Sequence, residues 1–511
     1  MVLRLLTTSV LIIGGGVSGL VTAHRLTVSR PTVEVLVAEG ASRPGGVMRS
    51  DQVSGFVLEW GPNGFLGNVP QTPALVGELG LQGRLLKASS DAKKRYLFKD
   101  GRLTPVPSSP VGFMMTPLLS FKGRWRTLAE PFQPPGAADD ESVAAFGRRR
   151  LGPEATSTFL DPLVTGVFGG DVERLSLPSA FPRIAKLEKD HGSLLRGMLA
   201  QAKHARREKR TAKVVKVPNG GNGNPQRDNL YKVGTSGSAV VQSGLSQARS
   251  GSDGVLPRVE RRALYSFHSG MEELVTALHS RLGERVHVDR SVESVHRVGD
   301  RFQATLHGGE SVEARAVVVA TPTGRAASLL SGEFPELAGE LEQIPYAGLA
   351  VVCLGYRRED VEHPLDGFGF LAPRGQGLRI LGAIWVSTIF PRHAPPGTVS
   401  LRVMVGGAHD PDVLGKTADE LVELTKGELE PILGLRGEPL VSKVYRHPLG
   451  IPQYNLGHAK RLQGLETRVG EIPGFFLAGN AHRGVGVNDC VANGERLAHR
   501  IQAFLGGVHT V

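Results

Sequence analysis

Residues 10–39 read VLIIGGGVSGLVTAHRLTVSRPTVEVLVAE, and this stretch decides the fold. The β-branched apolar run Val10–Ile13 leads into three glycines in G-x-G-x-x-G spacing, and a helix-like stretch follows them. A second strand-like run, Val33–Ala38, then ends at the acid Glu39. A strand, a glycine turn, a helix and a strand closed by an acid are the parts of a dinucleotide-binding βαβ unit. The stretch therefore predicts an α/β protein with a Rossmann-like domain.

Each glycine of the turn has its own physical reason. Gly14 permits the tight turn that leaves the strand, Gly16 lets the backbone approach a pyrophosphate, and Gly19 lets the helix pack closely on the sheet. The helix that starts near Ser18 offers free N–H groups to phosphate, and Glu39 is placed to accept hydrogen bonds from a ribose. A glycine turn alone can also be purely structural, but the flanking strands and the acid favour the nucleotide. The candidate cofactor-binding residues of this unit are Gly14, Gly15, Gly16, Val17, Ser18, Gly19 and Glu39.

Two further glycine-rich segments indicate which dinucleotide is bound. Arg43–Gly46 follows the ribose acid closely, and Glu59–Gly64 comes shortly afterwards. Each segment is compatible with an ordinary turn, but together they suggest backbone wrapped along a longer cofactor. The arrangement resembles FAD enzymes of the amine oxidase type, in which an R-x-G-G segment follows the ribose acid, more than nicotinamide dehydrogenases.

The composition bounds the size of the protein and the nature of its partners. A chain of 511 residues with 40% hydrophobic residues is expected to form two or three domains with a sizeable core. No apolar run approaches the roughly 18–20 residues that cross a bilayer, so we expect any membrane contact to be peripheral. The net charge of +11 favours nucleic acid, anionic lipid or a carboxylate substrate. Zinc-finger, RNP-like and helix-turn-helix patterns are all lacking, which argues against nucleic acid.

Cysteine and histidine usage predicts neither a disulfide framework nor a metal site. The two cysteines, Cys353 and Cys490, are expected to be small core residues in a reducing compartment. The sixteen histidines show no H-E-x-x-H or similar ligand spacing. Residues 1–33 carry arginines and no acid, as targeting segments do, but they contain the glycine motif. We therefore interpret them as mature protein and expect a cytoplasmic location.

The pattern along the chain predicts that the FAD-binding domain is assembled from three separated segments. All-apolar strands expected at 316–320 and 474–480 indicate that the chain returns to the first sheet late in the sequence. A glycine turn follows the second of these strands, and a helix is expected from 494 to 504. The predicted domains are FAD-binding segments at 1–90, 263–322 and 471–511, a hairpin with a helical, membrane-facing domain at 91–210, a flexible insertion without assigned function at 211–262, and an α+β substrate domain at 323–470.

Two local features of the middle region carry expectations of their own. Residues 91–106 are typical of a hairpin whose turn is Lys99–Gly101. Residues 184–203 are expected to form one amphipathic helix that ends in the basic run 203–210. Such a helix is either part of a bundle with a solvated tail or an element that lies on an anionic membrane surface.

Five motifs identify the chain as similar to the protoporphyrinogen oxidase family, the oxygen-dependent flavoenzymes of haem biosynthesis. The resemblance runs from Val10 to about Leu505 and is interrupted mainly at 211–262. It implies one non-covalent FAD. The motifs are Lys94–Tyr96, Thr165–Asp171, Asp366–Phe370, Pro448–Tyr454 and Gly484–Cys490. The FAD contacts that the resemblance implies beyond the first βαβ unit are Arg43, Gly46, Val47, Gly61, Pro62, Asn63, Gly64, Val292, Asn480, Val485, Gly486 and Val487.

The resemblance also implies a reaction and a substrate pocket. The reaction is the six-electron oxidation of protoporphyrinogen IX to protoporphyrin IX, with three O2 reduced to three H2O2. Arg95 would pair with a substrate propionate, and the backbone carbonyl of Gly166 would lie over the macrocycle. Leu330 and Phe370 would supply the apolar wall of the pocket. His447 departs from the family pattern, because related bacterial enzymes can carry an aromatic residue near the flavin at this position.

The residues assigned to the pocket are also compatible with plainer roles. Lys93–Arg95 fits a solvated charge run, Gly166 a simple turn, and Phe370 an ordinary core residue. The nearest alternative substrate is coproporphyrinogen III, which carries four propionates. An amine oxidase, a carotenoid desaturase or a flavin-binding scaffold without turnover are the remaining alternatives. The sequence does not determine the oligomeric state.

Overall fold

The predicted βαβ unit forms the middle of a seven-stranded sheet, in which β1 lies between β2 and β13. The computed structural model describes residues 5–136, 138–203 and 259–507. In this sheet the pairs β11–β12 and β12–β13 are antiparallel, and all other strand pairs are parallel. Its strands are β1 (Leu5–Ile13), β2 (Val35–Ala38), β10 (Val286–His287), β11 (Val292–Val298), β12 (Arg301–Leu306), β13 (Ser311–Val319) and β19 (Phe475–Leu477).

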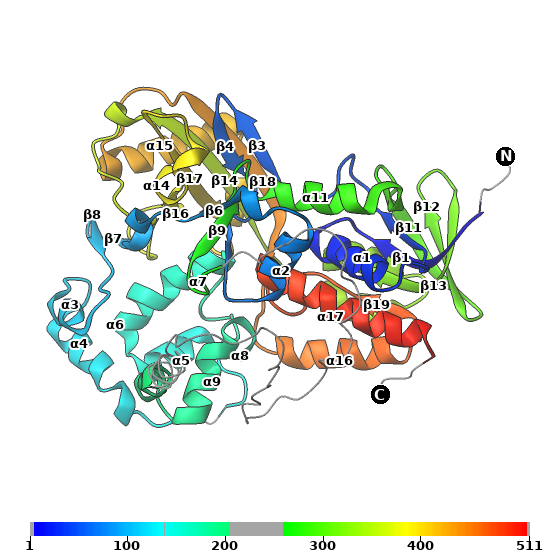
Figure 1. Cartoon of the computed structure of the whole chain (residues 1–511). Coiled ribbons are helices and arrows are strands. Elements are labelled where there is room, and N and C mark those ends of the chain that lie inside the picture. The colour runs from blue at the N-terminus through cyan, green and yellow to red at the C-terminus, as the bar shows by residue number, and fades with distance from the viewer. Residues whose placement is uncertain (1–4, 137, 204–258, 508–511) are drawn as a thin grey trace, which may run out of the picture.

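The apolar run Val10–Ile13 of β1 is buried on both faces, as predicted. Successive side chains of a strand point to opposite faces, so Val10 and Ile12 pack into one core while Leu11 and Ile13 pack into another. Helices cover both faces of the sheet (Figure 1), which makes it doubly wound. On one face lie α1 (Val17–Ser29), α2 (Gln71–Glu78), α11 (Glu272–Leu282) and α17 (Val487–Leu505), and on the other lie α12 (Thr323–Leu330), α13 (Pro335–Glu342) and α16 (His458–Gly470). The prediction of a Rossmann-like domain built from separated segments is confirmed.

A second sheet of seven strands forms the core of the substrate domain, at the upper left of Figure 1. Its strand order is β18-β14-β17-β16-β15-β7-β8. The strands are β7 (Tyr96–Lys99), β8 (Arg102–Pro105), β14 (Tyr346–Arg357), β15 (Gly369–Leu371), β16 (Ile380–Trp385), β17 (Thr398–Gly406) and β18 (Val441–Pro452). The helices α14 (Val386–Ile389) and α15 (Ala418–Leu433) belong to the same part of the chain.

Three segments belong to domains other than those expected. The hairpin β7–β8 forms as predicted, with Asp100 and Gly101 at positive φ in its turn, but β7 pairs with β15. The hairpin therefore belongs to the second sheet rather than to the helical domain. Residues 323–342 and 458–470 form α12, α13 and α16, which pack on the first sheet rather than within the substrate domain. Helices α12 and α13 follow β13 of the first sheet, and α16 follows β18 of the second sheet, so the boundaries depend on packing that composition does not reveal.

The helical domain occupies the lower left of Figure 1. The single helix expected at 184–203 is wrong: α9 ends at His191, Gly192 adopts φ 67°, and helical residues resume at 194. Glycine takes this left-handed conformation readily and ends helices there. The helices are α3 (Pro110–Met115), α4 (Phe121–Leu128), α5 (Val143–Arg150), α6 (Pro153–Ala155), α7 (Asp161–Phe168), α8 (Leu177–Ala180) and α9 (Pro182–His191).

Two small sheets join these parts. A hairpin is formed by β3 (Ser50–Val53) and β4 (Phe56–Glu59), and a three-stranded sheet by β5 (Phe65–Leu66), β9 (Leu264–Phe267) and β6 (Leu85–Lys87). Most of the expected insertion, together with the basic run after Lys203, lies outside the described residues. Within the described ranges, no helix combines the length and the apolarity that a bilayer crossing requires.

Candidate functional site

A cavity of about 780 Å³ begins at the carboxyl ends of β1 and β2 and extends to the second sheet. Crevices at the carboxyl ends of parallel strands are the usual ligand sites of doubly wound sheets, and this volume is typical of a ligand pocket. Three sequence regions far apart in the chain line it, namely 13–64, 291–329 and 479–490. Strands β14, β17 and β18 complete the wall at the opposite end.

The glycine turn lies at the middle of the cavity. Gly14 has φ 107°, and Gly16 caps α1 without any side-chain hydrogen bond to the first turn. A Cβ added to Gly16 would meet no atom within 4 Å, so this backbone is open to a ligand. A Cβ on Gly19 would instead lie 2.2 Å from the carbonyl oxygen of Gly14. Gly19 therefore serves the packing of helix on turn and does not line the cavity.

A second helix N-terminus faces the same cavity. Helix α17 begins at Val487, with Gly486 as its N-cap, and both residues line the cavity together with Val485 and Asn480. Helix N-termini carry free N–H groups and a partial positive charge. The N-termini of α1 and α17 thus both suit a pyrophosphate. The helix was expected only from residue 494, so this convergence was not predicted in full.

Glu39 lines the cavity and also holds the turn. Its Oε2 accepts a hydrogen bond from the N–H of Gly15 at 2.7 Å, and its Oε1 accepts one from Ala41 at 2.8 Å. Gly15 itself does not line the cavity. The carboxylate is thereby fixed at the end of β2, beside the cavity wall formed by Val292 and Arg325. This end suits the adenosine half of a dinucleotide, because an acid after the second strand binds ribose hydroxyls.

The opposite end of the cavity holds buried polar atoms without partners. The side-chain amide of Asn63 and the indole N–H of Trp60 have no hydrogen-bond partner among the described residues, and both line the cavity. Buried polar groups normally find a partner, so these atoms fit a ligand that offers both donors and acceptors. An isoalloxazine ring has such groups along its pyrimidine edge. The residues present therefore fit a flavin dinucleotide, whose adenosine would lie near Glu39 and whose ring would lie near the second sheet.

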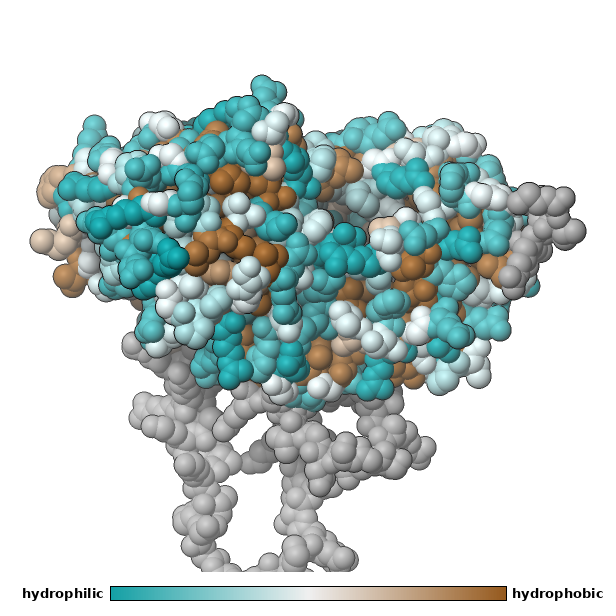
Figure 2. Space-filling model, turned by 90° about the horizontal axis from the view of Figure 1, so that it is seen from above, coloured by the Kyte–Doolittle hydropathy of each residue, from teal (hydrophilic) through white to brown (hydrophobic). Residues whose placement is uncertain are grey.

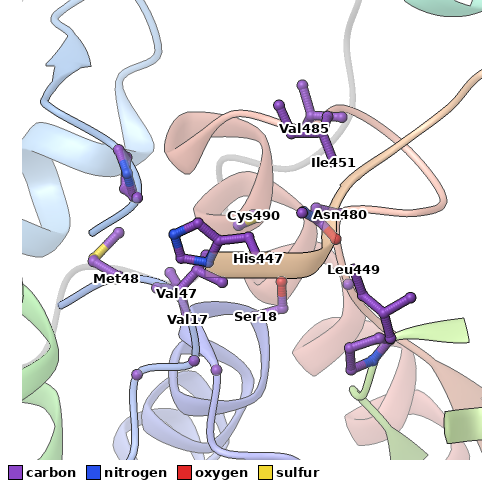
Figure 3. A pocket seen from close by; sticks show the side chains of 18 of the residues that line it. Val17, Ser18, Val47, Met48, His447, Leu449, Ile451, Asn480, Val485 and Cys490 are labelled. Atoms are coloured by element: carbon purple, nitrogen blue, oxygen red, sulfur yellow. The ribbon is translucent and has the colours of Figure 1, made fainter. Parts of the chain in front are cut away.

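His447 lies at the centre of this end, and Figure 3 shows its ring with Val47 and Met48 on one side and Asn480 on the other. Its Nε2 lies 2.9 Å from the carbonyl oxygen of Trp60. Burial lowers the pKa of His447, and the positive charge of Arg402 acts in the same direction. His447 is therefore neutral at pH 7, donates its Nε2 proton to Trp60, and keeps Nδ1 as an acceptor.

Several residues named from the sequence do not line the cavity. Arg43 pairs with Glu272 at 3.2 Å. Arg95 is exposed, with its guanidinium 5.2 Å from the ring centroid of Phe368. Leu330 is fully buried among the helices of the first domain.

Leu330 and Phe370, which were expected to form the apolar wall of the pocket, therefore do not line the cavity. Leu329 lines the cavity in place of Leu330, because adjacent residues of a helix point about 100° apart. Phe370 is buried in the core of the second sheet, behind the cavity wall. The family motif around Phe370 thus marks a strand of this sheet and not a residue that faces the cavity.

The remaining predicted residues line the cavity, and the structure adds others. Gly166 lines the cavity from α7, and a Cβ there would lie 2.5 Å from Leu371 Cδ2. The predicted residues on the wall are Gly14, Gly16, Val17, Ser18, Glu39, Gly46, Val47, Gly61, Pro62, Asn63, Gly64, Gly166, Val292, Asn480, Val485, Gly486 and Val487. Side chains that sequence reasoning did not place there include Met48, Trp60, Tyr346, Leu349, Val351, Ile384, Arg402, Met404, Leu449, Ile451 and Cys490.

Glu59 precedes the 60–64 loop and predicts a pH dependence of stability. Burial raises the pKa of Glu59 to about 7, although hydrogen bonds from Ser50 and the N–H of Met271 oppose this. A carboxyl group whose pKa is higher in the folded state stabilises the fold below its unfolded pKa, which is 4.5, and this stabilisation is lost as pH rises to about 7. Its contribution falls by about 1.4 kcal/mol per pH unit in that window.

We expect Glu59→Gln to remove this decline, because glutamine stays neutral. Urea unfolding at pH 5, 6, 7 and 8 measures it as a difference between variant and wild type. Glu466→Gln is the matched control, because Glu466 forms an exposed ion pair with Arg483. A Glu59→Gln profile parallel to that of the wild type would contradict the expectation.

Comparisons with known proteins agree with this geometry. The family model described as flavin containing amine oxidoreductase matches residues 17–502. Protoporphyrinogen oxidase of Bos taurus is 33% identical, over 96% of this chain and 98% of that protein. Coproporphyrinogen III oxidase of Bacillus subtilis is 27% identical, over 95% of this chain and 96% of that protein. A crystal structure of a provisionally named protoporphyrinogen oxidase from Exiguobacterium has the same fold, with a TM-score of 0.76, 22% identity, and coverage of 97% of this chain and 98% of that one.

Proposed function

Because this chain belongs to the flavin-containing amine oxidoreductase family, we propose that it is an FAD-dependent protoporphyrinogen oxidase. It would oxidise protoporphyrinogen IX to protoporphyrin IX by six electrons and reduce three O2 to three H2O2. The flavin is the hydride acceptor in this chemistry, so the protein need only bind, orient and exclude water. That division suits a site whose walls contain no catalytic dyad or triad among the described residues.

The apolar character of the cavity at the end formed by the second sheet is the observation on which the choice of substrate rests. The wall there consists largely of Leu349, Val351, Ile384, Met404, Leu449 and Ile451. Arg402 is the one lining residue at this end with a permanent charge among the described residues, and it is buried. A reduced tetrapyrrole with two vinyl groups buries more apolar surface in such a cavity than one with four propionates. The lining therefore favours protoporphyrinogen IX over coproporphyrinogen III.

The entrance to the cavity has the same character. Val47, Val167 and Leu449 line the cavity and are 45%, 44% and 51% exposed. Exposed apolar residues gathered around one opening are typical of a binding site. Gly166, next to Val167, keeps its proposed role of presenting a carbonyl to the macrocycle. Arg95 keeps its proposed role as a propionate anchor on the surface, where the carboxylates of a partly enclosed substrate would remain.

The cofactor would be held without a covalent bond. Gly14–Ser18 and Val485–Val487 would bind the pyrophosphate, Glu39 the ribose, and Asn63 the flavin ring. The free thiol of Cys490 lies on the wall, but burial raises its pKa to about 11. A thiol held protonated is a poor nucleophile, which supports non-covalent binding. Acid precipitation should therefore release all flavin into the supernatant.

The experiment that tests the function is aerobic turnover of FAD-loaded protein with protoporphyrinogen IX and coproporphyrinogen III. Porphyrin fluorescence and peroxide yield are measured together, and Arg95→Ala is assayed beside Lys94→Ala, whose side chain pairs with Asp366. Faster turnover of protoporphyrinogen, with one peroxide per two electrons, supports the proposal. Faster turnover of coproporphyrinogen would make that the substrate. A flavin-loaded protein that oxidises neither would be a scaffold without turnover.

The helical domain is also the part that would meet a membrane. Helix α4 is tied to α3 by a hydrogen bond from Arg124 to the carbonyl oxygen of Met114. Figure 2 shows apolar residues at the left edge of the molecule, the end where α3 and α4 lie in Figure 1. We use the name apolar lip for five exposed apolar side chains in residues 111–132. They are Val111 (75%), Met115 (78%), Phe121 (68%), Trp125 (53%) and Phe132 (83%).

We expect removal of the apolar lip to weaken membrane binding. Trp125→Ser with Phe132→Ser takes away two side chains whose burial in lipid is worth about 1.5–3 kcal/mol each, so vesicle affinity should fall more than about a hundredfold. Co-sedimentation with phosphatidylcholine–phosphatidylglycerol vesicles measures it. Val298→Ser is the matched control, because Val298 is 56% exposed in β11 of the first domain. Equal binding by all three proteins would contradict the proposal. The cytoplasmic location stays a prediction.

A further inference from the structure

Arg402 is a buried cation in the wall of the cavity. Arg402 is 6% exposed and lies on β17, the third strand in the order of the second sheet. The guanidinium donates from Nη2 to the carbonyl oxygen of Gly61 at 2.6 Å and from Nε to that of Glu59 at 3.4 Å. Both acceptors are neutral backbone groups. The guanidinium is thus fixed in place, and its remaining N–H groups are available at the cavity.

The charge of Arg402 has no carboxylate that neutralises it among the described residues. Glu59 is the acid that acts on it, but the Glu59 carboxyl accepts hydrogen bonds from Ser50 and Met271 instead. No carboxylate within the described ranges lies within 4.0 Å of the guanidinium, in contrast to Arg150, which pairs with Glu188 at 2.5 Å. A buried charge without a counter-charge costs several kcal/mol. Such a charge fits a site in which an anion is bound or formed during function.

Further hydrogen-bonding groups converge on the same end of the cavity. The indole N–H of Trp60 and the side-chain amide of Asn63 line it and are unpartnered among the described residues. They belong to the same loop as Gly61, whose carbonyl Arg402 holds. The adenosine end, marked by Glu39, lies at the carboxyl end of β2. The guanidinium of Arg402 therefore lies at the end of the cavity opposite Glu39, where the flavin ring of a bound FAD would lie.

We infer that Arg402 stabilises the negative charge of the reduced flavin. A hydride brings two electrons and one proton to the neutral oxidised ring, so the reduced ring carries one negative charge on its pyrimidine edge. The substrate loses that hydride, and O2 takes the two electrons and two protons to become H2O2 when the ring is reoxidised. A fixed cation favours the charged form over the neutral one. The inference rests on the FAD site and not on the identity of the tetrapyrrole.

The experiment compares FAD-loaded Arg402→Gln, Arg402→Lys and wild type in the absence of any porphyrinogen. Anaerobic equilibration with a reference dye gives the potential of the bound flavin, and a sulfite titration gives the dissociation constant of its anionic adduct. We expect Arg402→Gln to disfavour the reduced form at least tenfold, which is about 30 mV for a two-electron couple. Sulfite binding should weaken by a similar factor. Arg402→Lys should restore most of both effects, because it keeps the charge.

Arg446→Gln is the matched control, because Arg446 is an exposed cation on β18 of the same sheet. Its potential should equal that of the wild type. An unchanged potential in Arg402→Gln would overturn the inference. If the potential is unchanged and only the KM for porphyrinogen rises, the anion that Arg402 binds is a substrate carboxylate. If Arg402→Gln holds no FAD, Arg402→Lys decides, and a tenfold loss despite its retained charge would overturn the inference equally.

Discussion

Replacement of Gly16 with valine is expected to abolish FAD binding while the protein still folds. Gly16 has φ −69° and ψ 173°, which any residue adopts, and a Cβ there meets no atom of the protein within 4 Å. The added side chain would therefore occupy the open space beside the first turn of α1. A phosphate must approach this backbone closely, so FAD affinity should fall by more than about a hundredfold, or about 2.7 kcal/mol.

Gly19→Ala is the informative comparison, because the same cofactor loss has a different cause. Its Cβ would lie 2.2 Å from the carbonyl oxygen of Gly14, and that oxygen is backbone that cannot rotate away. Helix α1 must move off the turn, so both stability and FAD affinity should fall. Urea unfolding of the apoprotein and fluorescence titration with FAD separate the two variants. A Gly16→Val protein that keeps its flavin, or that unfolds as easily as Gly19→Ala, would refute the assigned role of Gly16.

Replacement of Arg150 with methionine is expected to lower the free energy of unfolding by about 3–5 kcal/mol. Arg150 is fully buried in α5 and donates from Nε to Glu188 at 2.6 Å, and it also binds the carbonyl oxygens of Gln133 and Gly192. It thereby joins α5 to α9 and to the segment that precedes α5. Its loss leaves Glu188 with one cationic partner among the described residues, Arg149, and removes the guanidinium that lies 3.5 Å from Glu130.

The neighbouring arginine provides the control for this substitution. Arg148 forms an ion pair with Glu173 in which the two side chains are 49% and 47% exposed. Such surface pairs contribute at most about 1 kcal/mol, so Arg148→Met should unfold close to the wild type. Far-UV circular dichroism in urea measures both variants. Equal stabilities of the two variants would show that burial of the Arg150 network contributes nothing.

The first domain was predictable because its signals are local. The strand, glycine turn and acid of residues 10–39 depend on each other over short distances, and each glycine is required by backbone geometry. The hairpin at 96–105 was predictable for the same reason, since Asp100 and Gly101 take the positive φ angles that its turn needs. Its place in the second sheet was not, because β7 pairs with a strand roughly 270 residues away.

The part of the site that comes from the second sheet was largely missed. Arg402 stands in the strand-like run SLRVMVG and looks like a solvent-facing residue of a half-buried strand, since alternation is the usual signal. Only its packing against the 59–61 carbonyls reveals it as a cavity residue. The early start of α17 was missed because Gly494 resembles the glycine of a helix N-terminus. Gly494 instead lies inside the helix, where a Cβ would come within 3.0 Å of Val21.

The pairing of β1 with β13 has a consequence for synthesis of the protein. Residues 5–13 lie beside residues 311–319 along the whole length of β1. At about 5–20 residues per second, the ribosome needs roughly 15–60 s to make the intervening chain. During that time one edge of a largely apolar strand has no partner, and an unpaired edge is a template for aggregation. The nascent chain should therefore depend on a chaperone until its middle third has emerged, and a slow stretch of translation before β13 would lower its yield more than one after it.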